Sequence, residues 1–375
     1  MHQLAQTLRR VPEPPLARFF AQHRGHARFP LSSSDVEECG LQELLALADD
    51  ETRHLWEELT LGYADVEGRL PLRAEIAGLY PGLEADDVLV CAGADEAILL
   101  ALTALLGPDD HAVVTWPGYA PLRDVAKATG AGVSLLRLDS GTGWALDPEA
   151  LRRLLRPTTR VVIVNFPHNP TGALPDRATF EAVVALTREV GATLLSDEVY
   201  RFLERPGTDR LPTAAGAGGV SLGGLSKTLG LAGLRIGWLA SRDRALLARA
   251  AQLKHSASGC ASAPSEILAL IALRARDRLL ARSRGRLHEN LALLEAFFES
   301  PFRALRVDTA ARRKRGLPAL ASPPARGGVR RRAGARGGCA RRSRLGLRGR
   351  REPFPDRLWT RLLDGGARGA RSLRG

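Results

Sequence analysis

DDVLVCAGADEAILLALTALLG, residues 86–107, joins two hydrophobic patterns at one glycine. The first part is a continuous apolar run with the length of a strand buried on both faces, and it closes at Gly93. The second part repeats its apolar residues at helical spacing, which predicts an amphipathic helix over 94–107. A buried strand followed directly by a helix is the repeating unit of α/β proteins with a parallel sheet.

The same alternation continues along most of the chain. Apolar strand-like segments are separated by segments of helical length, so we predict a mostly parallel sheet covered on both faces, a three-layer α/β/α fold. The expected large domain spans 61–250. Residues 1–60 and 251–375 are assigned to a smaller α/β domain that looks incomplete. Helices expected over 242–256 and 283–300 would lead away from the sheet.

The composition excludes several classes of protein. No apolar run reaches the roughly 18 residues that a membrane span requires, and the first 15 residues lack the apolar core of a signal peptide. We therefore expect a cytoplasmic protein with no membrane partner. The four cysteines form no CxxC pair, so neither a zinc site nor a disulfide framework is predicted, and no other metal is expected.

The net charge of +13 comes from one end of the chain. Residues 303–375 contain 22 of the 54 Lys and Arg residues but only 4 of the 41 Asp and Glu residues, a net charge of +18, which leaves the first 302 residues at −5. This basic segment has no hydrophobic period and no interleaved aromatic residues, so we do not expect a nucleic-acid partner. Two interpretations stay open: a solvated, disordered tail, or a sequence altered by a frame shift.

One lysine marks the candidate reaction centre. Lysine occurs four times against fifty arginines, and Lys227 lies in the glycine-rich segment SLGGLSKTLGLAGLRIGWLA, residues 221–240. A lysine on a loop that approaches a ligand closely is a candidate Schiff-base nucleophile, because burial lowers the pKa of its amine. A surface lysine in a flexible loop is the alternative for this residue taken alone.

Two segments could bind an anion. Arg235 follows Lys227 by eight residues in a strand-like segment, and its guanidinium could hold a phosphate through paired hydrogen bonds. The backbone amides of Gly93, Ala94 and Asp95 open the first helix, whose positive end attracts anions. Taken alone, Arg235 is equally compatible with an ordinary ion pair. The segment 93–95 is equally compatible with an ordinary turn from a strand to a helix.

Two polar residues follow buried strands. Asp197 ends an apolar segment, where a carboxylate is costly to bury without a cationic partner. A protonated pyridine nitrogen is such a partner, and a structural ion pair is the alternative. Asn169 lies in the turn FPHNPTG, where its amide could donate to a phenolate oxygen, although Asn-Pro-Thr-Gly is also simply a favourable turn sequence.

In combination, these segments resemble the pyridoxal-phosphate enzymes of fold type I, specifically the class I/II aminotransferases, over roughly residues 30–300. The motifs that carry the resemblance are, in order, GYAD (62–65), AGADEA (92–97), PGY (117–119), NPTG (169–172), SDEVY (196–200) and SKTLGLAGLRIGW (226–238). The resemblance implies a pyridoxal 5′-phosphate cofactor, L-amino acid and 2-oxo acid substrates, and a homodimer with shared active sites.

The resemblance also implies roles around the cofactor ring. Lys227 would form a Schiff base with the cofactor and carry the proton between the substrate α-carbon and the cofactor. Asp197 would pair with the pyridinium nitrogen, and Tyr119 would stack on the ring. Asn169 and Tyr200 would bond its phenolic oxygen.

The implied phosphate contacts come from two subunits. Those within one chain are Gly93, Ala94, Asp95 and Arg235, and Tyr63 would reach the phosphate of the neighbouring subunit. The sequence departs from the family at Gly224, where a phosphate-binding serine or threonine is usual. Either Ser226 compensates for this change or one phosphate bond is missing.

The substrate-binding arginine and the reaction are open to alternatives. Within SRLGLRGRREPFPDRL, residues 343–358, Arg344 matches the family's arginine for the substrate α-carboxylate, and a chance match in an arginine-rich tail is the alternative. The expected reaction is amino-group transfer between an L-amino acid and a 2-oxo acid. Segments 31–47, 162–173 and 223–238 are also similar to the cyclases of the capreomycidine synthase type, which leaves β-elimination and cyclisation of a hydroxylated amino acid as the alternative.

Overall fold

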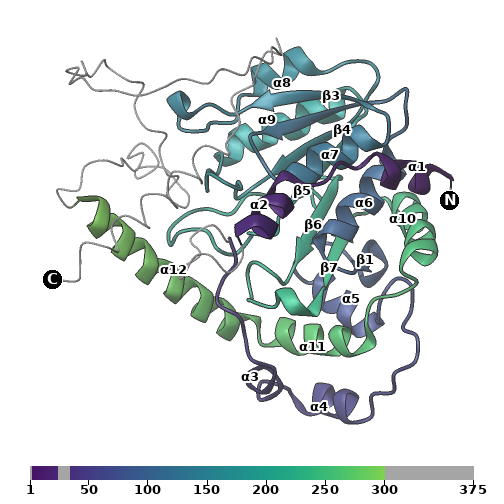
Figure 1. Ribbon diagram of the computed structural model, residues 1–375, viewed down its shortest axis with the longest axis vertical. Helices are drawn as coiled ribbons and strands as arrows, with labels where there is room; N and C mark the ends of the chain where they lie inside the picture. Colours follow the sequence, from purple (N-terminus) through teal and green to yellow (C-terminus); the bar gives the residue numbers. More distant parts are fainter. Residues whose placement is uncertain (1, 24–33, 300–375) are drawn as a thin grey trace, which may run out of the picture.

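The computed structural model describes residues 2–23 and 34–299 of the chain. A seven-stranded sheet lies at its centre, with the strand order β1-β7-β6-β5-β4-β2-β3 (Figure 1). The strands are β1 Val88–Cys91, β2 His111–Trp116, β3 Gly132–Arg137, β4 Thr159–Asn165, β5 Thr193–Asp197, β6 Val220–Gly224 and β7 Gly237–Ala240.

The strand directions place the carboxyl ends of most strands at one edge. Strands β6, β5, β4, β2 and β3 are parallel neighbours, whereas β7 is antiparallel to both β6 and β1. β1 therefore runs in the same direction as the five parallel strands. The register pairs Asn165 with Asp197 and Asp197 with Leu222. The prediction of a mostly parallel sheet is confirmed.

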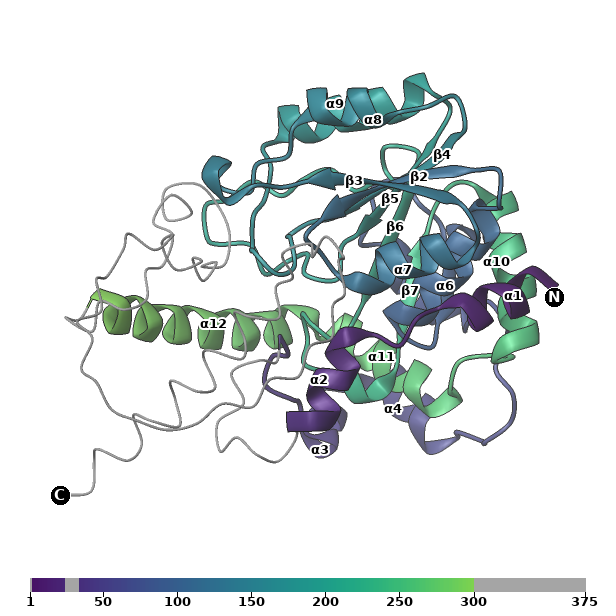
Figure 2. The ribbon, with the colours of Figure 1, turned by 45° about the horizontal axis from the view of Figure 1, so that its top comes forward.

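Helices cover both faces of this sheet. Between them the described residues contain α1 His2–Arg10, α2 Pro15–His23, α3 Leu41–Leu45, α4 Asp50–Glu57, α5 Leu70–Ala77, α6 Ala94–Leu105, α7 Ala120–Ala128, α8 Pro148–Leu154, α9 Arg177–Glu189, α10 Arg244–Ala257, α11 Ala263–Arg274, α12 Arg276–Glu299 and the short 3₁₀ turns η1 Ala85–Asp87, η2 Ser140–Thr142 and η3 Ala232–Leu234. One hydrophobic core joins α6, α7 and α10 to one face. On the other face, α8 and α9 cover the β3 end, while α5 and α11 cover the β1 end (Figure 2). The predicted three-layer α/β/α fold is confirmed.

Of the two helices expected to lead away from the sheet, one packs against it and the other extends away. α10 packs against α6 and the sheet, contrary to the prediction, because Leu246, Leu247 and Ala250 give it a buried apolar stripe. α12 does extend away from the body of the molecule, as Figures 1 and 2 show. The basic segment 303–375 and Arg344 lie outside the described residues, and the domain bounds stay a prediction.

None of the helices in residues 2–23 and 34–299 combines the length and the apolar character needed to cross a membrane. That part of the chain also contains no group of three or more His, Cys, Asp or Glu side chains arranged to hold a metal ion.

Candidate functional site

The predicted site residues follow the carboxyl ends of four strands. Gly93 follows β1, Asn169 follows β4, Asp197 ends β5, and Lys227 lies in the turn after β6. Since these strands run in one direction, the four residues come to the same edge of the sheet. In open α/β sheets this edge is where ligands bind.

Lys227 points at a segment that precedes the large domain. Its Nζ donates a hydrogen bond to Ser34 Oγ at 3.2 Å and forms an ion pair with the carboxylate of Asp35. The hydroxyl of Tyr200 donates to the same Ser34 Oγ, also at 3.2 Å, and burial raises the pKa of Tyr200 to about 12. The sequence predicted Lys227 and Tyr200 here but not Ser34 and Asp35.

Asp197 is a buried carboxylate with few partners that would stabilise its charge. It is 3% exposed, and among the described residues its side chain accepts one hydrogen bond, from the backbone N–H of Val199 at 3.2 Å. Burial is the main cause that raises the pKa of Asp197 to about 7; the carboxylates of Glu198 and Asp95 act in the same direction, whereas the hydrogen bond from Val199 and the charge of Lys227 act to lower it. A cation bound beside it would relieve this penalty.

Asn165 fixes both Asp197 and the Asn169 turn. Its side-chain amide donates to the backbone oxygen of Asp197 at 3.0 Å, and its side-chain oxygen accepts from the backbone N–H of Asn169 at 2.8 Å. Asn165 is 1% exposed. Asn165 was not predicted from the sequence, although an asparagine that ends an apolar strand is a signal that could have indicated it.

His168 joins the Asn169 turn to the turn that carries Tyr119. Its Nε2 lies 2.7 Å from the backbone oxygen of Pro117, so Nε2 must be the donor, and Nδ1 then accepts from the hydroxyl of Thr171 at 2.7 Å. Burial lowers the pKa of His168 to about 4, which keeps the ring neutral at pH 7. The two turns are therefore held together by a buried, uncharged histidine.

Tyr119 is bonded to the first turn of α6. Its hydroxyl donates to Asp95 at 2.7 Å. Burial, and then the Asp95 carboxylate, raise the pKa of Tyr119 far above its usual value, so the phenol stays protonated. This bond ties the turn after β2 to the helix that follows β1.

Glycines allow Arg235 to approach the start of α6. Gly93 has a φ of +94°, which only glycine adopts readily, and a Cβ there would lie 2.9 Å from Cζ of Arg235. A Cβ on Gly237 would lie 2.6 Å from the backbone nitrogen of Ala94. The guanidinium thus lies beside the N-terminal amides of α6, a combination suited to a phosphate.

The described residues of one chain do not test three of the points raised by the resemblance. Tyr63 is fully exposed and does not join the site of its own chain. Gly224 offers no side chain for a phosphate, and a Cβ there would meet its nearest neighbour at 3.4 Å, so packing does not explain the glycine. Arg344 lies outside the described residues.

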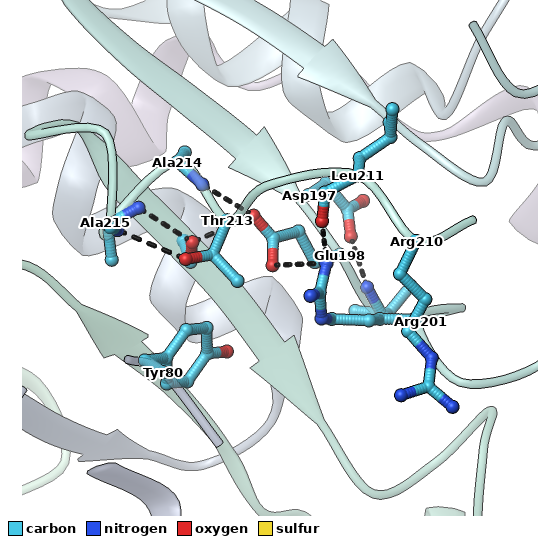
Figure 3. Close-up of polar contacts among 12 residues, drawn as sticks. Tyr80, Asp197, Glu198, Arg201, Arg210, Leu211, Thr213, Ala214 and Ala215 are labelled. Carbon is cyan, nitrogen blue, oxygen red and sulfur yellow. Dashed lines mark hydrogen bonds and ion pairs between the residues drawn. The ribbon is translucent and has the colours of Figure 1, made fainter. Parts of the chain in front are cut away.

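A second buried carboxylate lies beside Asp197 and has a structural role. Glu198 Oε1 accepts from the backbone N–H of Ala214 at 3.0 Å and from the hydroxyl of Ser221 at 2.8 Å, and Oε2 lies 3.9 Å from Arg201 Nη1 (Figure 3). Burial raises the pKa of Glu198, whereas Arg201 and these donors lower it. Glu198 is thus engaged by the loop that leads into β6, and Asp197 is the carboxylate at the site.

We call Arg235 and the backbone amides at the start of α6 the phosphate cradle. Together with Lys227 and the buried Asp197 carboxylate, it suits a cofactor that has a carbonyl group, a basic ring nitrogen and a phosphate. The residues present fit pyridoxal 5′-phosphate: Asp197 lacks a strong cationic partner, and Gly93 leaves space beside Arg235 that a Cβ would fill. Comparison with known proteins agrees. Residues 31–309 match the model for aminotransferase class I and II, and the chain belongs to this pyridoxal-phosphate-dependent family.

Individual relatives share part of the chain. It is 36% identical over 186 residues to the arginine–pyruvate transaminase of Pseudomonas aeruginosa, covering 47% of each protein. It is 34% identical over 234 residues to capreomycidine synthase of Streptomyces vinaceus, covering 61% of this chain and 59% of that one. A PLP-dependent aminotransferase from Streptococcus suis superposes with a TM-score of 0.73 at 31% identity over 79% of each chain. The chain therefore matches about half of the length of these two curated relatives.

Proposed function

We propose that this protein is a pyridoxal-phosphate-dependent aminotransferase that moves an amino group between an L-amino acid and a 2-oxo acid. The observation that carries the proposal is the buried Asp197 carboxylate at the same sheet edge as Lys227. A carboxyl group whose pKa is raised to about 7 is suited to binding a protonated ring nitrogen. Membership of the aminotransferase family supports the same assignment.

The proposed roles follow from the contacts at this edge. When bound, pyridoxal phosphate supplies an aldehyde for amino groups and a protonated ring that withdraws electrons from the substrate α-carbon. The Lys227 amine would hold the cofactor and, when released, move a proton to and from that carbon. Asp197 would keep the ring nitrogen protonated, because its charge inside the protein stabilises a cation there.

Other residues would orient the cofactor. Arg235 and the amides of Gly93, Ala94 and Asp95 would hold the phosphate. Tyr119 is fixed by its bond to Asp95 and would lie against the ring face. Tyr200 and Asn169 would donate to the phenolic oxygen. Tyr200 shares a hydrogen-bond acceptor, Ser34, with Lys227. Asn169 is positioned by the hydrogen bond from its backbone N–H to Asn165.

The test is amino transfer by the protein loaded with pyridoxal phosphate. L-amino acids are offered with pyruvate or 2-oxoglutarate, and the alanine or glutamate formed is measured. We expect formation of the new amino acid from at least one donor and none with Lys227→Ala. Absence of transfer with every donor and acceptor would contradict the proposed reaction.

A second function is favoured by one relative. Similarity to capreomycidine synthase over 61% of the chain supports elimination of a β-hydroxyl group as water, followed by ring closure. Such a reaction needs no 2-oxo acid, because no amino group leaves the substrate. Turnover of a β-hydroxylated amino acid without any acceptor would favour this function over transamination.

The assembly and location also remain proposals. Leu61 is 86% exposed and Tyr63 is fully exposed on the segment between α4 and α5, which supports contact with a second subunit. A homodimer is expected to elute at twice the chain's mass of 40.4 kDa in size-exclusion chromatography with light scattering. A monomer would contradict it. The cytoplasmic location stays a prediction.

A further inference from the structure

Two charged side chains outside the candidate site are completely buried. Lys254 on α10 and Glu266 on α11 are both 0% exposed. Burial raises the pKa of Glu266, whereas the hydrogen bond from the backbone N–H of Arg69 and the charge of Lys254 lower it. The lysine therefore compensates part of the charge of the carboxylate. Charged side chains are rarely retained in such positions unless they are paired and hydrogen-bonded.

Both side chains bind the backbone of one short segment. The Nζ of Lys254 donates a hydrogen bond to the backbone oxygen of Val66. Oε2 of Glu266 accepts one from the backbone N–H of Arg69 at 3.1 Å. Helices α10 and α11 thus each hold one end of residues 66–69.

Strand β1 holds the same segment from the side of the sheet. The backbone N–H of Val90 donates to the backbone oxygen of Glu67 at 2.9 Å. Gly68 packs so closely on this strand that a Cβ there would lie 2.6 Å from Cβ of Val90. Residues 66–69 are therefore fixed by three separate elements.

The residues immediately before this segment project into solvent. Leu61 is 86% exposed and Tyr63 is fully exposed. Packing within its own chain does not fix the Tyr63 side chain, so its place is set by the backbone that follows it. Val66 comes three residues later, a reach of about 10 Å in extended chain. Releasing the segment at Val66 would therefore let Tyr63 move by more than a hydrogen bond tolerates.

We propose that Lys254 and Glu266 are positioning residues for the active site of a neighbouring subunit. By holding residues 66–69, they present the Tyr63 hydroxyl to the phosphate of the pyridoxal phosphate that a second copy of this chain binds. This proposal rests on the cofactor and the homodimer of the proposed function. Because the pair acts through the backbone that leads to Tyr63, its effect falls on the partner's site and not on the site of its own chain.

The test separates the two subunits of the dimer. Subunits with different affinity tags are co-expressed, and each mixed dimer isolated contains one Lys227→Ala subunit. The absorbance of pyridoxal phosphate attached to Lys227 then reports only the site of the other subunit. The buried pair is made neutral by Lys254→Met and Glu266→Gln together, because Gln can still accept from Arg69 and no single buried charge is left behind.

With the neutral pair in the Lys227→Ala subunit, we expect the reporting site to bind pyridoxal phosphate about tenfold more weakly than in a mixed dimer with the native pair. This is the loss of one hydrogen bond to a charged group. With the neutral pair in the subunit that keeps Lys227, the affinity should be unchanged. A loss in the second arrangement, equal losses in both, or no loss in either would overturn the proposal. Failure of the neutral-pair subunit to fold or assemble would also overturn it, since the pair would then serve the fold.

Tyr63→Phe in the Lys227→Ala subunit is the matched comparison. Its side chain is fully exposed, so the substitution leaves the fold intact, and it should cause about the same tenfold loss. Adding it to the neutral pair in the same subunit should weaken binding no further, because both changes remove the same hydrogen bond. A further tenfold loss would overturn the proposal. Failure of the proposed function is seen separately, as an unaltered protein that is monomeric or attaches no cofactor.

Discussion

Replacing Asp197 by Asn should stabilise the cofactor-free protein while weakening its response to the cofactor. The carboxylate is buried with one backbone donor, from Val199 at 3.2 Å, and Asn can accept the same hydrogen bond without a charge. The neutral side chain removes the penalty of a buried charge. It also removes the group proposed to bind a protonated ring nitrogen, so pyridoxal phosphate should add less stability to the variant.

The size of the stability gain in Asp197→Asn, and its dependence on pH, follow from the raised pKa of Asp197. In the folded protein burial raises the pKa of Asp197 from 3.8 to about 7, so the folded state holds the proton more strongly than the unfolded state. The free energy of unfolding therefore falls as pH rises from about 4 to about 7 and is level above that. At about 1.4 kcal/mol for each pH unit, the penalty reaches roughly 4 kcal/mol above pH 7 and less than half of this at pH 5.

The assay is urea unfolding of the cofactor-free and loaded proteins at pH 5 and pH 8. Cofactor-free Asp197→Asn should exceed the unaltered protein in stability by a few kcal/mol at pH 8 and by clearly less at pH 5. Asp109→Asn, a charge removal at an exposed residue, should change stability by less than about 0.5 kcal/mol at both pH values. A loss of stability in cofactor-free Asp197→Asn, or an effect independent of pH, would contradict a buried charge at Asp197.

Three further predictions concern the surroundings of the site. Gly93→Ala should lower the free energy of unfolding by about 1–3 kcal/mol, because a φ of 94° with a ψ of 171° is open essentially to glycine alone. It should also weaken pyridoxal-phosphate affinity through contact with Arg235, as measured by unfolding and cofactor titration. Gly143→Ala, at a φ of +67° with open space around it, should show only a loss of stability. Equal cofactor affinity in Gly93→Ala and Gly143→Ala would contradict phosphate binding between Gly93 and Arg235. Tyr119→Phe removes a 2.7 Å hydrogen bond and should cost about 1–2 kcal/mol of stability in urea unfolding, and no loss would show that the bond is not formed. Burial lowers the pKa of His168 in the folded protein to about 4. The free energy of unfolding of the unaltered protein should therefore fall by up to roughly 3 kcal/mol relative to His168→Gln as pH falls from 6.5 to 4. Parallel profiles of stability against pH for the two proteins would contradict a buried neutral ring.

Local sequence patterns were sufficient for the fold and for most of the sheet-edge residues. Apolar runs and helical spacing are properties of short segments, and the residues directly after each run, such as Gly93 and Lys227, are carried to the same edge once the strands are parallel. The same logic placed Asp197 at the end of its strand. The roles of these residues toward the cofactor stay a prediction.

Features that depend on tertiary contacts were not predicted. Ser34 and Asp35 are 193 and 192 residues from Lys227 in sequence, and nothing in their own segment indicates that it lies over the lysine. The packing of α10 was predicted wrongly for a related reason. An amphipathic stripe shows that a helix is buried on one side but not which surface covers that side.

The proposed Schiff-base role of Lys227 is tested most directly by identifying the side chain that holds the cofactor. The protein loaded with pyridoxal phosphate is reduced with sodium borohydride, digested and examined by mass spectrometry. We predict the reduced cofactor on Lys227 and on no other lysine. A label on Lys127 or Lys254 in place of Lys227, or no label at all, would contradict it.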